Sequence, residues 1–155
     1  GEADYAFSLL TAIHDRSWWN MIKSGTTIAM EAWDLKYKPN SDWNHAWGAA
    51  PANIIPSCLW GISPVRPGFA KAVIRPQLSK LAYSKIRMPI IRGQIEAEFK
   101  NKEGKREYLV TIPANVECDF VLSGVNNLTI SVNGKKLKTE TGIIKLKPGA
   151  NKISF

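Results

Sequence analysis

The residues best suited to chemistry lie in the stretch 25–48. It contains one carboxylate among apolar and aromatic neighbours, Glu31, and one imidazole, His45. Three indoles lie in the same stretch: Trp33, Trp43 and Trp47. Aromatic rings pack on the C–H faces of a sugar, while carboxylate and imidazole groups reach its hydroxyls or the bond to be broken. Because an unpaired buried charge is costly, the setting of Glu31 favours a functional role and the combination indicates a carbohydrate site.

Each of these polar residues also has a structural interpretation. Glu31 could take a proton from water as a general base, or it could be an ion-paired surface carboxylate, the commoner role of a glutamate. His45 could donate to a sugar hydroxyl, or bond a backbone carbonyl within the core. Asp42 is interpreted as a helix cap, and Asp34 as a group that orients its neighbours or faces solvent.

Glycoside hydrolysis needs two carboxyl groups, one as the acid and one as the base or nucleophile. Glu31 supplies one. The other acidic residues near the N-terminus fall on predicted helix-surface or capping positions: Glu2, Asp4 and Asp15. We therefore expect the acid to come from chain upstream of Gly1. A serine hydrolase is disfavoured because there is no Gly-x-Ser-x-Gly elbow, and no glycine-rich phosphate loop is present.

The two cysteines, Cys58 and Cys118, fall in different halves of the chain. They are predicted to be buried thiols, and a disulfide between them is left open. Because no Cys/His cluster has the spacing of a metal site, we expect no metal and no cofactor.

The composition is that of a globular protein with an uneven charge. Of the 155 residues, 45% are hydrophobic and 22% charged, and the formal charge is +8. Residues 1–61 carry four Lys/Arg against six Asp/Glu, whereas the remainder carries 17 against seven. The lysines of the second half alternate with apolar residues along predicted strands or lie in turns. This pattern indicates a solvated β surface, so we expect no nucleic-acid partner, and no apolar run is long enough to span a membrane.

Helical periodicity dominates residues 1–61. Apolar residues at spacings of three and four predict a helix over 2–14, and a second short helix runs over 16–23, capped by Asp15 and ended by Gly25. Residues 26–40 have no helical period, and residues 26–31 are expected to be extended. A third helix is predicted to begin at Ser41 or Asp42 and to end at Gly61. One stripe of it carries Trp43, Ala46, Trp47, Ala50 and Ile54.

In residues 62–155, apolar and polar residues alternate with a period of two. After a predicted linker over 62–68, strands are expected at 72–75, at 91–99 and through three later apolar sets, at 108–112, 116–122 and 128–132. A last strand, 151–155, is expected at a sheet edge. Turn signals separate them at Lys102-Glu-Gly104, Asn126-Asn127, Asn133-Gly134, Thr141-Gly142 and Pro148-Gly149. The predicted fold class is α+β, with a helical segment over 1–61 and an antiparallel β-sandwich over 62–155.

Three motifs resemble the C-terminal part of bacterial α-L-rhamnosidases. They are Gly-Thr-Thr-Ile-Ala-Met-Glu-Ala-Trp-Asp (25–34), Trp-Asn-His-Ala-Trp-Gly (43–48) and Pro-Gly-Phe-Ala-Lys-Ala-Val-Ile-Arg-Pro (67–76). Their order and spacing match the family over residues 1 to about 80, and the sandwich beyond fits by architecture. These enzymes are inverting glycoside hydrolases with an α/α toroid followed by a C-terminal β-sandwich. The resemblance implies that residues 1–61 are the last hairpins of such a toroid.

The resemblance also implies roles for single residues. It places the general base on Glu31 and a ligand of the rhamnose hydroxyls on His45, with Trp33 and Trp47 at aromatic positions near the sugar. The family's general acid has no counterpart here. We therefore expect a fragment of a rhamnosidase that acts on rhamnose-containing carbohydrate and is inactive alone, in a periplasmic or extracellular location.

Two other functions remain open at this point. One is a non-catalytic carbohydrate-binding or scaffolding module that uses the indoles only to hold sugar. The other is a toroid glycosidase with a different sugar specificity. Helices taken from a toroid would also leave apolar faces uncovered at Phe7, Leu10 and Trp18, so we expect the chain to self-associate.

Overall fold

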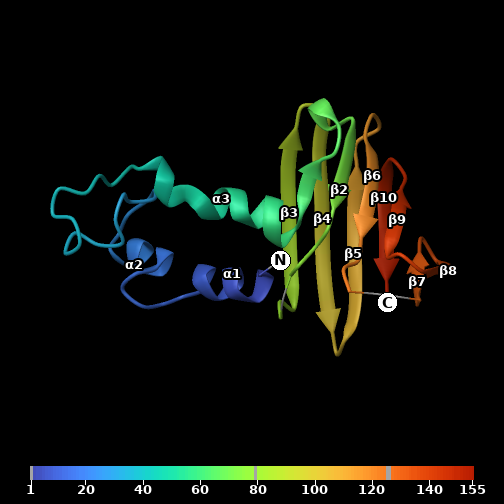
Figure 1. Ribbon diagram of the computed structural model, residues 1–155, viewed down its shortest axis with the longest axis horizontal. Coiled ribbons are helices and arrows are strands. Elements are labelled where there is room, and N and C mark those ends of the chain that lie inside the picture. Colours follow the sequence, from blue (N-terminus) through green and yellow to red (C-terminus); the bar gives the residue numbers. More distant parts are fainter. Residues whose placement is uncertain (1, 79, 125–126) are drawn as a thin grey trace. The chain divides into compact units, whose positions relative to one another are not determined.

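The computed structural model describes residues 2–78, 80–124 and 127–155. These residues form two compact units, Gly1–Ile55 and Pro56–Phe155, and each unit is described by itself. Figure 1 shows helices and loops in the first unit and strands in the second. No helix among the described residues is long and apolar enough to cross a membrane.

The first unit contains short helices joined by long loops. They are α1 (Ala3–Leu10), α2 (Trp18–Lys23), a 3₁₀ helix η1 (Ala46–Ala49) and α3 (Ala50–Ile54), and a π-helical turn η2 (Ile55–Leu59) begins at the last residue of this unit and continues into the next. None of the residues of α1 is buried. The surface of this unit exposes several apolar side chains, among them Tyr5, Leu9, Ile13 and Ile22. The expected self-association of the chain therefore stays a prediction.

Two predicted helix starts are wrong. Ser17, not Asp15, caps α2, because the Ser17 hydroxyl accepts a hydrogen bond from the backbone N–H of Asn20 at 3.2 Å. The third helix begins at Ala46 rather than at Ser41 or Asp42, so Asp42 is not its cap. The extended backbone of His45 (φ −132°, ψ 118°) precedes it. Gly25 does end α2, with φ +88°.

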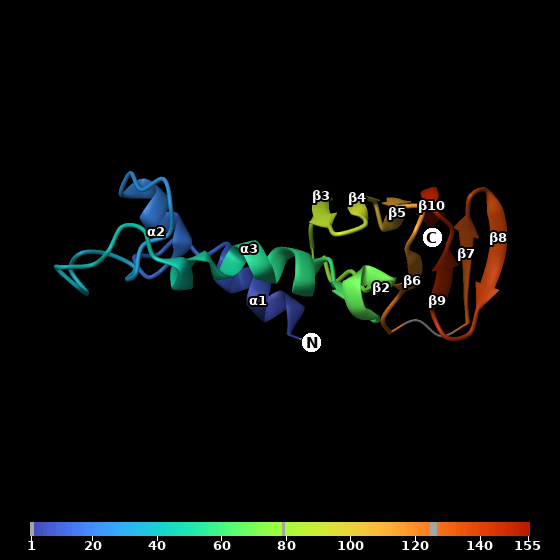
Figure 2. The same cartoon turned by 90° about the horizontal axis from the view of Figure 1, so that it is seen from above.

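The second unit is a β-sandwich. The strands among its described residues are β1 (Ile62–Pro64), β2 (Lys71–Ile74), β3 (Tyr83–Ile90), β4 (Gly93–Lys102), β5 (Lys105–Ile112), β6 (Glu117–Val121), β7 (Leu128–Val132), β8 (Lys135–Thr139), β9 (Ile143–Leu146) and β10 (Gly149–Ser154). They form a four-stranded sheet of order β1-β2-β6-β9 and a six-stranded sheet of order β3-β4-β5-β10-β7-β8. Figure 2 shows the strands of the two sheets as two layers.

The core of the sandwich lies between the two layers. Its fully buried side chains come from both sheets, as the alternation of apolar residues predicts. They include Ile74 and Phe120 from one sheet, and Ile95, Val110 and Ile153 from the other. The fold class, a helical segment followed by antiparallel sheets, is confirmed. Among the strand pairs of the described residues, β2–β6 departs from this pattern, because its strands run parallel.

Several details of the sandwich differ from the sequence-based expectation. Residues 62–64 form β1 within the predicted linker, and β3 was not predicted at all. Ile91 lies in the turn between β3 and β4 and is 85% exposed, so the predicted start of that strand is wrong. β10 is not an edge strand, since it lies between β5 and β7. Asn126 of the predicted Asn126-Asn127 turn lies outside the described residues.

The two cysteines are free, and only Cys118 is buried. Burial raises the pKa of the Cys118 thiol to about 12. Cys58 is exposed, so its predicted burial is wrong. Because the thiolate is the reactive form, we expect a thiol reagent at neutral pH to modify Cys58 readily and Cys118 only after unfolding. Mass spectrometry of the labelled native and denatured chain checks this, and rapid labelling of Cys118 in the native chain would contradict it.

Candidate active site

Two loops of the first unit form the frame of the candidate site. The backbone N–H of Glu31 donates to the carbonyl of Asp42 at 2.9 Å, and the N–H of His45 donates to the carbonyl of Ala29 at 2.8 Å. These bonds join segment 29–31 to segment 42–45 and explain why the latter is extended rather than helical. Between them, Met30 is only 1% exposed and anchors the first segment. The frame therefore holds the backbones of Glu31 and His45 close to each other.

Gly48 allows the start of the third helix to lie directly against this frame. A Cβ atom at Gly48 would overlap the carbonyl oxygen of Met30 and lie 2.9 Å from the Cβ of Ala29. The carbonyl of Gly48 also accepts a hydrogen bond from the indole N–H of Trp18 at 2.7 Å. A glycine is needed here for the close approach of two backbones, rather than for a positive φ.

The carboxylate of Glu31 is held at both oxygens. Oε1 forms an ion pair with the ammonium of Lys38, and Oε2 accepts a hydrogen bond from the backbone N–H of Asp42 at 3.4 Å. The side chain is 21% exposed. The hydrogen bond from Lys38 lowers the pKa of Glu31 below its ordinary value, and the N–H of Asp42 acts in the same direction. Glu31 is therefore ionised at neutral pH.

His45 lies next to this carboxylate. One ligand atom from each of Glu31, Asp42 and His45 falls within 4.8 Å of the others, and Nδ1 of His45 is 3.8 Å from the Asp42 carboxylate. The imidazole meets the indole of Trp47 edge-on, with ring centroids 5.1 Å apart. Trp47 itself is 85% exposed, so its face is open to a ligand. The structure thus brings together a carboxylate, an imidazole and an open aromatic ring.

The same three side chains are the ones that could hold a metal ion among the described residues. Two carboxylates and one imidazole suit a divalent cation such as zinc. However, Oε1 of Glu31 is already paired with Lys38, so a cation would first have to displace the ammonium. We therefore derive no chemistry from a metal here.

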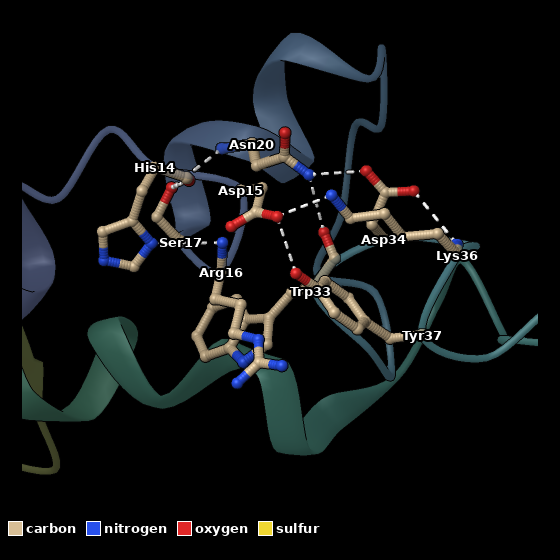
Figure 3. Close-up of polar contacts among 9 residues, drawn as sticks. All are labelled: His14, Asp15, Arg16, Ser17, Asn20, Trp33, Asp34, Lys36 and Tyr37. Carbon is tan, nitrogen blue, oxygen red and sulfur yellow. Dashed lines mark hydrogen bonds and ion pairs between the residues drawn. The ribbon is translucent and has the colours of Figure 1, made fainter.

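Trp33 belongs to a neighbouring cluster rather than to this one. Its indole packs edge-on against Trp18, with centroids 5.0 Å apart, and its carbonyl accepts a hydrogen bond from the side-chain amide of Asn20 at 2.9 Å. Figure 3 shows Asn20 binding Asp34 as well, also at 2.9 Å. Asp34 therefore holds its own loop, one of the two alternatives left open for it.

The cluster of Figure 3 is completed by Asp15. Its carboxylate accepts from the ammonium of Lys36 at 2.5 Å and from the hydroxyl of Tyr37 at 2.7 Å. These bonds lower the pKa of Asp15 to about 2. They tie the loop that follows Glu31 back to the residues before α2.

No motif in the sequence indicates Lys38 as the partner of Glu31. Two turns bring Lys38 back to it, closed by bonds from the N–H of Tyr37 to the carbonyl of Asp34 at 3.1 Å and from the N–H of Ser41 to the carbonyl of Lys38 at 2.9 Å. Pro39-Asn40 signals a turn in the sequence, but nothing there indicates which side chain the turn returns to Glu31.

Comparison with known proteins agrees with this architecture. The family described as bacterial alpha-L-rhamnosidase 6 hairpin glycosidase domain matches residues 1–59, and the bacterial alpha-L-rhamnosidase C-terminal domain matches residues 61–137. The two domains relate the chain to glycoside hydrolases. The chain belongs to the bacterial α-L-rhamnosidase family, of which it represents the C-terminal part.

Individual relatives are similar over most of the chain. It is 29% identical to an α-L-rhamnosidase of Alteromonas sp. (strain LOR) over 144 residues, and 27% identical to one of Formosa agariphila over 141 residues. Each alignment covers 87% of this chain but only 16% and 15% of those proteins. The chain thus spans about a sixth of the length of these relatives.

Solved structures of α-L-rhamnosidases share the fold. The enzyme of Streptomyces avermitilis, complexed with L-rhamnose, gives a TM-score of 0.81 at 18% identity over 100% of this chain and 16% of its own. The enzyme of Dictyoglumus thermophilum gives 0.82 at 19% identity, covering 96% of this chain and 18% of its own. These likenesses show the fold, and the resemblance predicted from the three motifs is confirmed.

Proposed function

We propose that residues 25–48 supply part of the active site of an inverting α-L-rhamnosidase. Glu31 is the general base that deprotonates the attacking water, and His45 binds a hydroxyl of the rhamnose. The observation that carries the proposal is the position of the ionised Glu31 carboxylate, within 4.8 Å of the His45 imidazole. The family supports the sugar, since two similar proteins are α-L-rhamnosidases and one structural neighbour was solved in complex with L-rhamnose.

The state of Glu31 suits a base rather than an acid. An acid must hold its proton at working pH, whereas the ion pair with Lys38 keeps Glu31 deprotonated. Inverting enzymes need a second carboxyl about 6.5–9.5 Å from the base, so that a water fits between them and the sugar. Asp42 lies nearer than this and its side chain is 74% exposed, so we do not assign it as the acid. The acid is expected from another part of a longer enzyme, and the chain alone is expected not to hydrolyse rhamnosides.

A second candidate is a carbohydrate-binding module without catalysis. The exposed indole of Trp47, and that of Trp43 at 45% exposure, favour it, because stacking on sugar needs open rings. The two candidates differ in whether the ionised Glu31 is needed for turnover or only for binding. A toroid glycosidase acting on another sugar would share Glu31 and differ in the substrate it accepts.

The stereochemistry of the product tests the proposed mechanism. In a full-length enzyme that contains this segment, an α-L-rhamnoside should release β-L-rhamnose first, because water enters on the face opposite the leaving group. Proton NMR during the first minutes of the reaction distinguishes the two anomers before they equilibrate. Initial release of α-L-rhamnose would contradict the assignment of Glu31 as the base of an inverting reaction.

A further inference from the structure

The six-stranded sheet of the second unit ends in a basic edge strand. β8 is the last strand in the order and lies next to β7 (Figure 2). Its sequence is Lys-Lys-Leu-Lys-Thr (135–139), and its three lysines are all exposed. This strand therefore concentrates positive charge at one edge of the sandwich.

Two of these lysines lie on the face of the sheet that points away from the core. Lys136 is paired with Ser131 of β7. Lys138 is paired with Thr129 of the same strand. Residues directly opposite each other in an antiparallel pair share a face. Ile130, between Thr129 and Ser131, is 1% exposed and points to the core, so its two neighbours and their partners point outward.

This outward face continues onto β10, where Ser154 is paired with Ser131. The five outward residues, called the lysine–hydroxyl strip, are Thr129, Ser131, Lys136, Lys138 and Ser154. Their side chains form no ion pair and no hydrogen bond with another described residue. The ammonium and hydroxyl groups of the strip are therefore available to a ligand.

The carboxylates elsewhere on this face already have cationic partners. Their ion pairs are Arg87–Glu96 at 3.0 Å, Lys100–Glu98 at 2.7 Å and Lys152–Glu107 at 3.3 Å. Glu140 directly follows β8, but it forms no ion pair with a lysine of the strip. The positive charge of the strip is therefore left without a counterion from the described part of the chain.

We propose that the lysine–hydroxyl strip binds an anionic polysaccharide. Ammonium and hydroxyl groups both donate to sulfate or carboxylate oxygens, and hydrogen bonds between charged groups are the stronger ones. Neighbouring strands lie about 4.8 Å apart, so the strip extends over roughly 10 Å across three strands. An open surface of this kind does not enclose a small anion. A chain of charged sugars contacts several of its groups at once, and such contacts reinforce one another.

A polysaccharide fits the strip better than a nucleic acid. Proteins that bind single-stranded nucleic acid stack its bases on aromatic rings or guanidinium groups, and the strip contains neither. The choice of a saccharide also rests on the proposed function, because these contacts would hold an enzyme for rhamnose-containing carbohydrate on its polymer. The strip uses neither Glu31 nor His45, so its binding is measured without turnover and is tested separately from the proposed catalysis.

The lysines of β8 also have a structural role. Charges on an edge strand prevent it from pairing with a strand of another chain. A charge of either sign does this, whereas binding of an anion needs a positive charge. The double variant Lys136→Glu/Lys138→Glu therefore separates the two roles, because it keeps the edge charged and removes the attraction.

The test is calorimetric titration of the 155-residue chain with dextran sulfate, and with neutral dextran as the ligand control. At an ionic strength of about 0.15 M, we expect binding to dextran sulfate and none to dextran. Lys136→Glu/Lys138→Glu should weaken the affinity by about tenfold or more, because two attractions become repulsions. Lys23→Glu/Lys80→Glu is the matched control, since it changes the net charge equally at two exposed lysines outside the strip. Its affinity should stay within about threefold of wild type, because salt screens distant charges.

An equal loss of affinity in the two double variants would overturn the inference, because the attraction would then come from net charge alone. Absence of binding to dextran sulfate would overturn it too, and so would tighter binding of the strip to duplex DNA. The unfolding midpoint of each variant in urea is measured alongside, and we expect it to match the wild type. If charge reversal lowers it, Lys136→Gln/Lys138→Gln decides, and wild-type affinity in that variant overturns the inference.

Discussion

Glu31→Gln should lower kcat/KM for an aryl α-L-rhamnoside by about 10²–10⁴-fold in a full-length enzyme that contains this segment. Glutamine keeps the shape of the side chain but cannot accept the proton of the attacking water. Two backbone hydrogen bonds, from the N–H of Glu31 and from the N–H of His45, join the loop segments, and the amide oxygen of glutamine can still accept from the N–H of Asp42, so the loop should stay in position. The affinity for L-rhamnose should therefore change little, which separates loss of the base from loss of sugar binding.

The matched control for this substitution is Glu2→Gln. Glu2 is an exposed carboxylate of the same unit that lies outside the candidate site, and its variant should keep wild-type turnover. Turnover of Glu31→Gln within a few-fold of wild type would remove Glu31 from the reaction and favour the carbohydrate-binding alternative. Steady-state kinetics for the three proteins, with L-rhamnose binding measured by calorimetry, completes the comparison.

Gly48→Ala should destabilise the first unit by about 1–3 kcal/mol, the usual cost of overpacking. The added methyl group cannot fit against the carbonyl of Met30, so η1 or the segment 29–31 must move. Either movement weakens the hydrogen bond from Trp18 to residue 48 and shifts Glu31 relative to His45. We expect a lower unfolding midpoint in urea, followed by tryptophan fluorescence, and a fall in activity in the full-length enzyme.

Ala46→Ser is the control for Gly48→Ala. Ala46 belongs to the same 3₁₀ helix, its side chain is exposed, and a hydroxyl there meets solvent. Its unfolding midpoint should match that of the wild type. Equal stability and activity of Gly48→Ala and Ala46→Ser would contradict this prediction, because it would show that the close approach of η1 to Met30 does not stabilise the frame.

The sandwich was largely predictable because its signal is local. The alternation through Ile95, Ala97 and Phe99 fixes which face of β4 is buried, and the structure buries all three. Strand β3 was not predicted from the sequence. None of its residues is fully buried, so no alternating row of apolar residues marks it as a strand. The turn between β3 and β4 has Ile91 and Arg92 at its two central positions, where tight hairpin turns favour glycine or asparagine. Only the next residue is a glycine, Gly93, with φ +123°.

The first unit was harder to predict because contacts distant in sequence decide its loops. The stripe of Trp43, Ala46 and Trp47 suggests a helix from Asp42, but the bonds from 42–45 to 29–31 keep that segment extended. Tertiary hydrogen bonds override local periodicity there. The same bonds bring His45 to Glu31, which the motifs indicate only through the family resemblance, and the roles of these residues stay predictions.

No pattern in the sequence predicts the ion pair between Lys38 and Glu31. An ion pair between half-buried side chains lowers the pKa of the carboxyl and orients it, yet it depends on two consecutive turns.

Azide rescue of Glu31→Gly tests the central claim most directly. Removing the carboxylate leaves space for a small anion on the face of the sugar where water is activated, and azide needs no base. With α-L-rhamnosyl fluoride as substrate, the variant should regain activity as the azide concentration rises, and the product should be β-L-rhamnosyl azide. Absence of rescue, or a product of α configuration, would show that Glu31 does not lie where the nucleophile attacks.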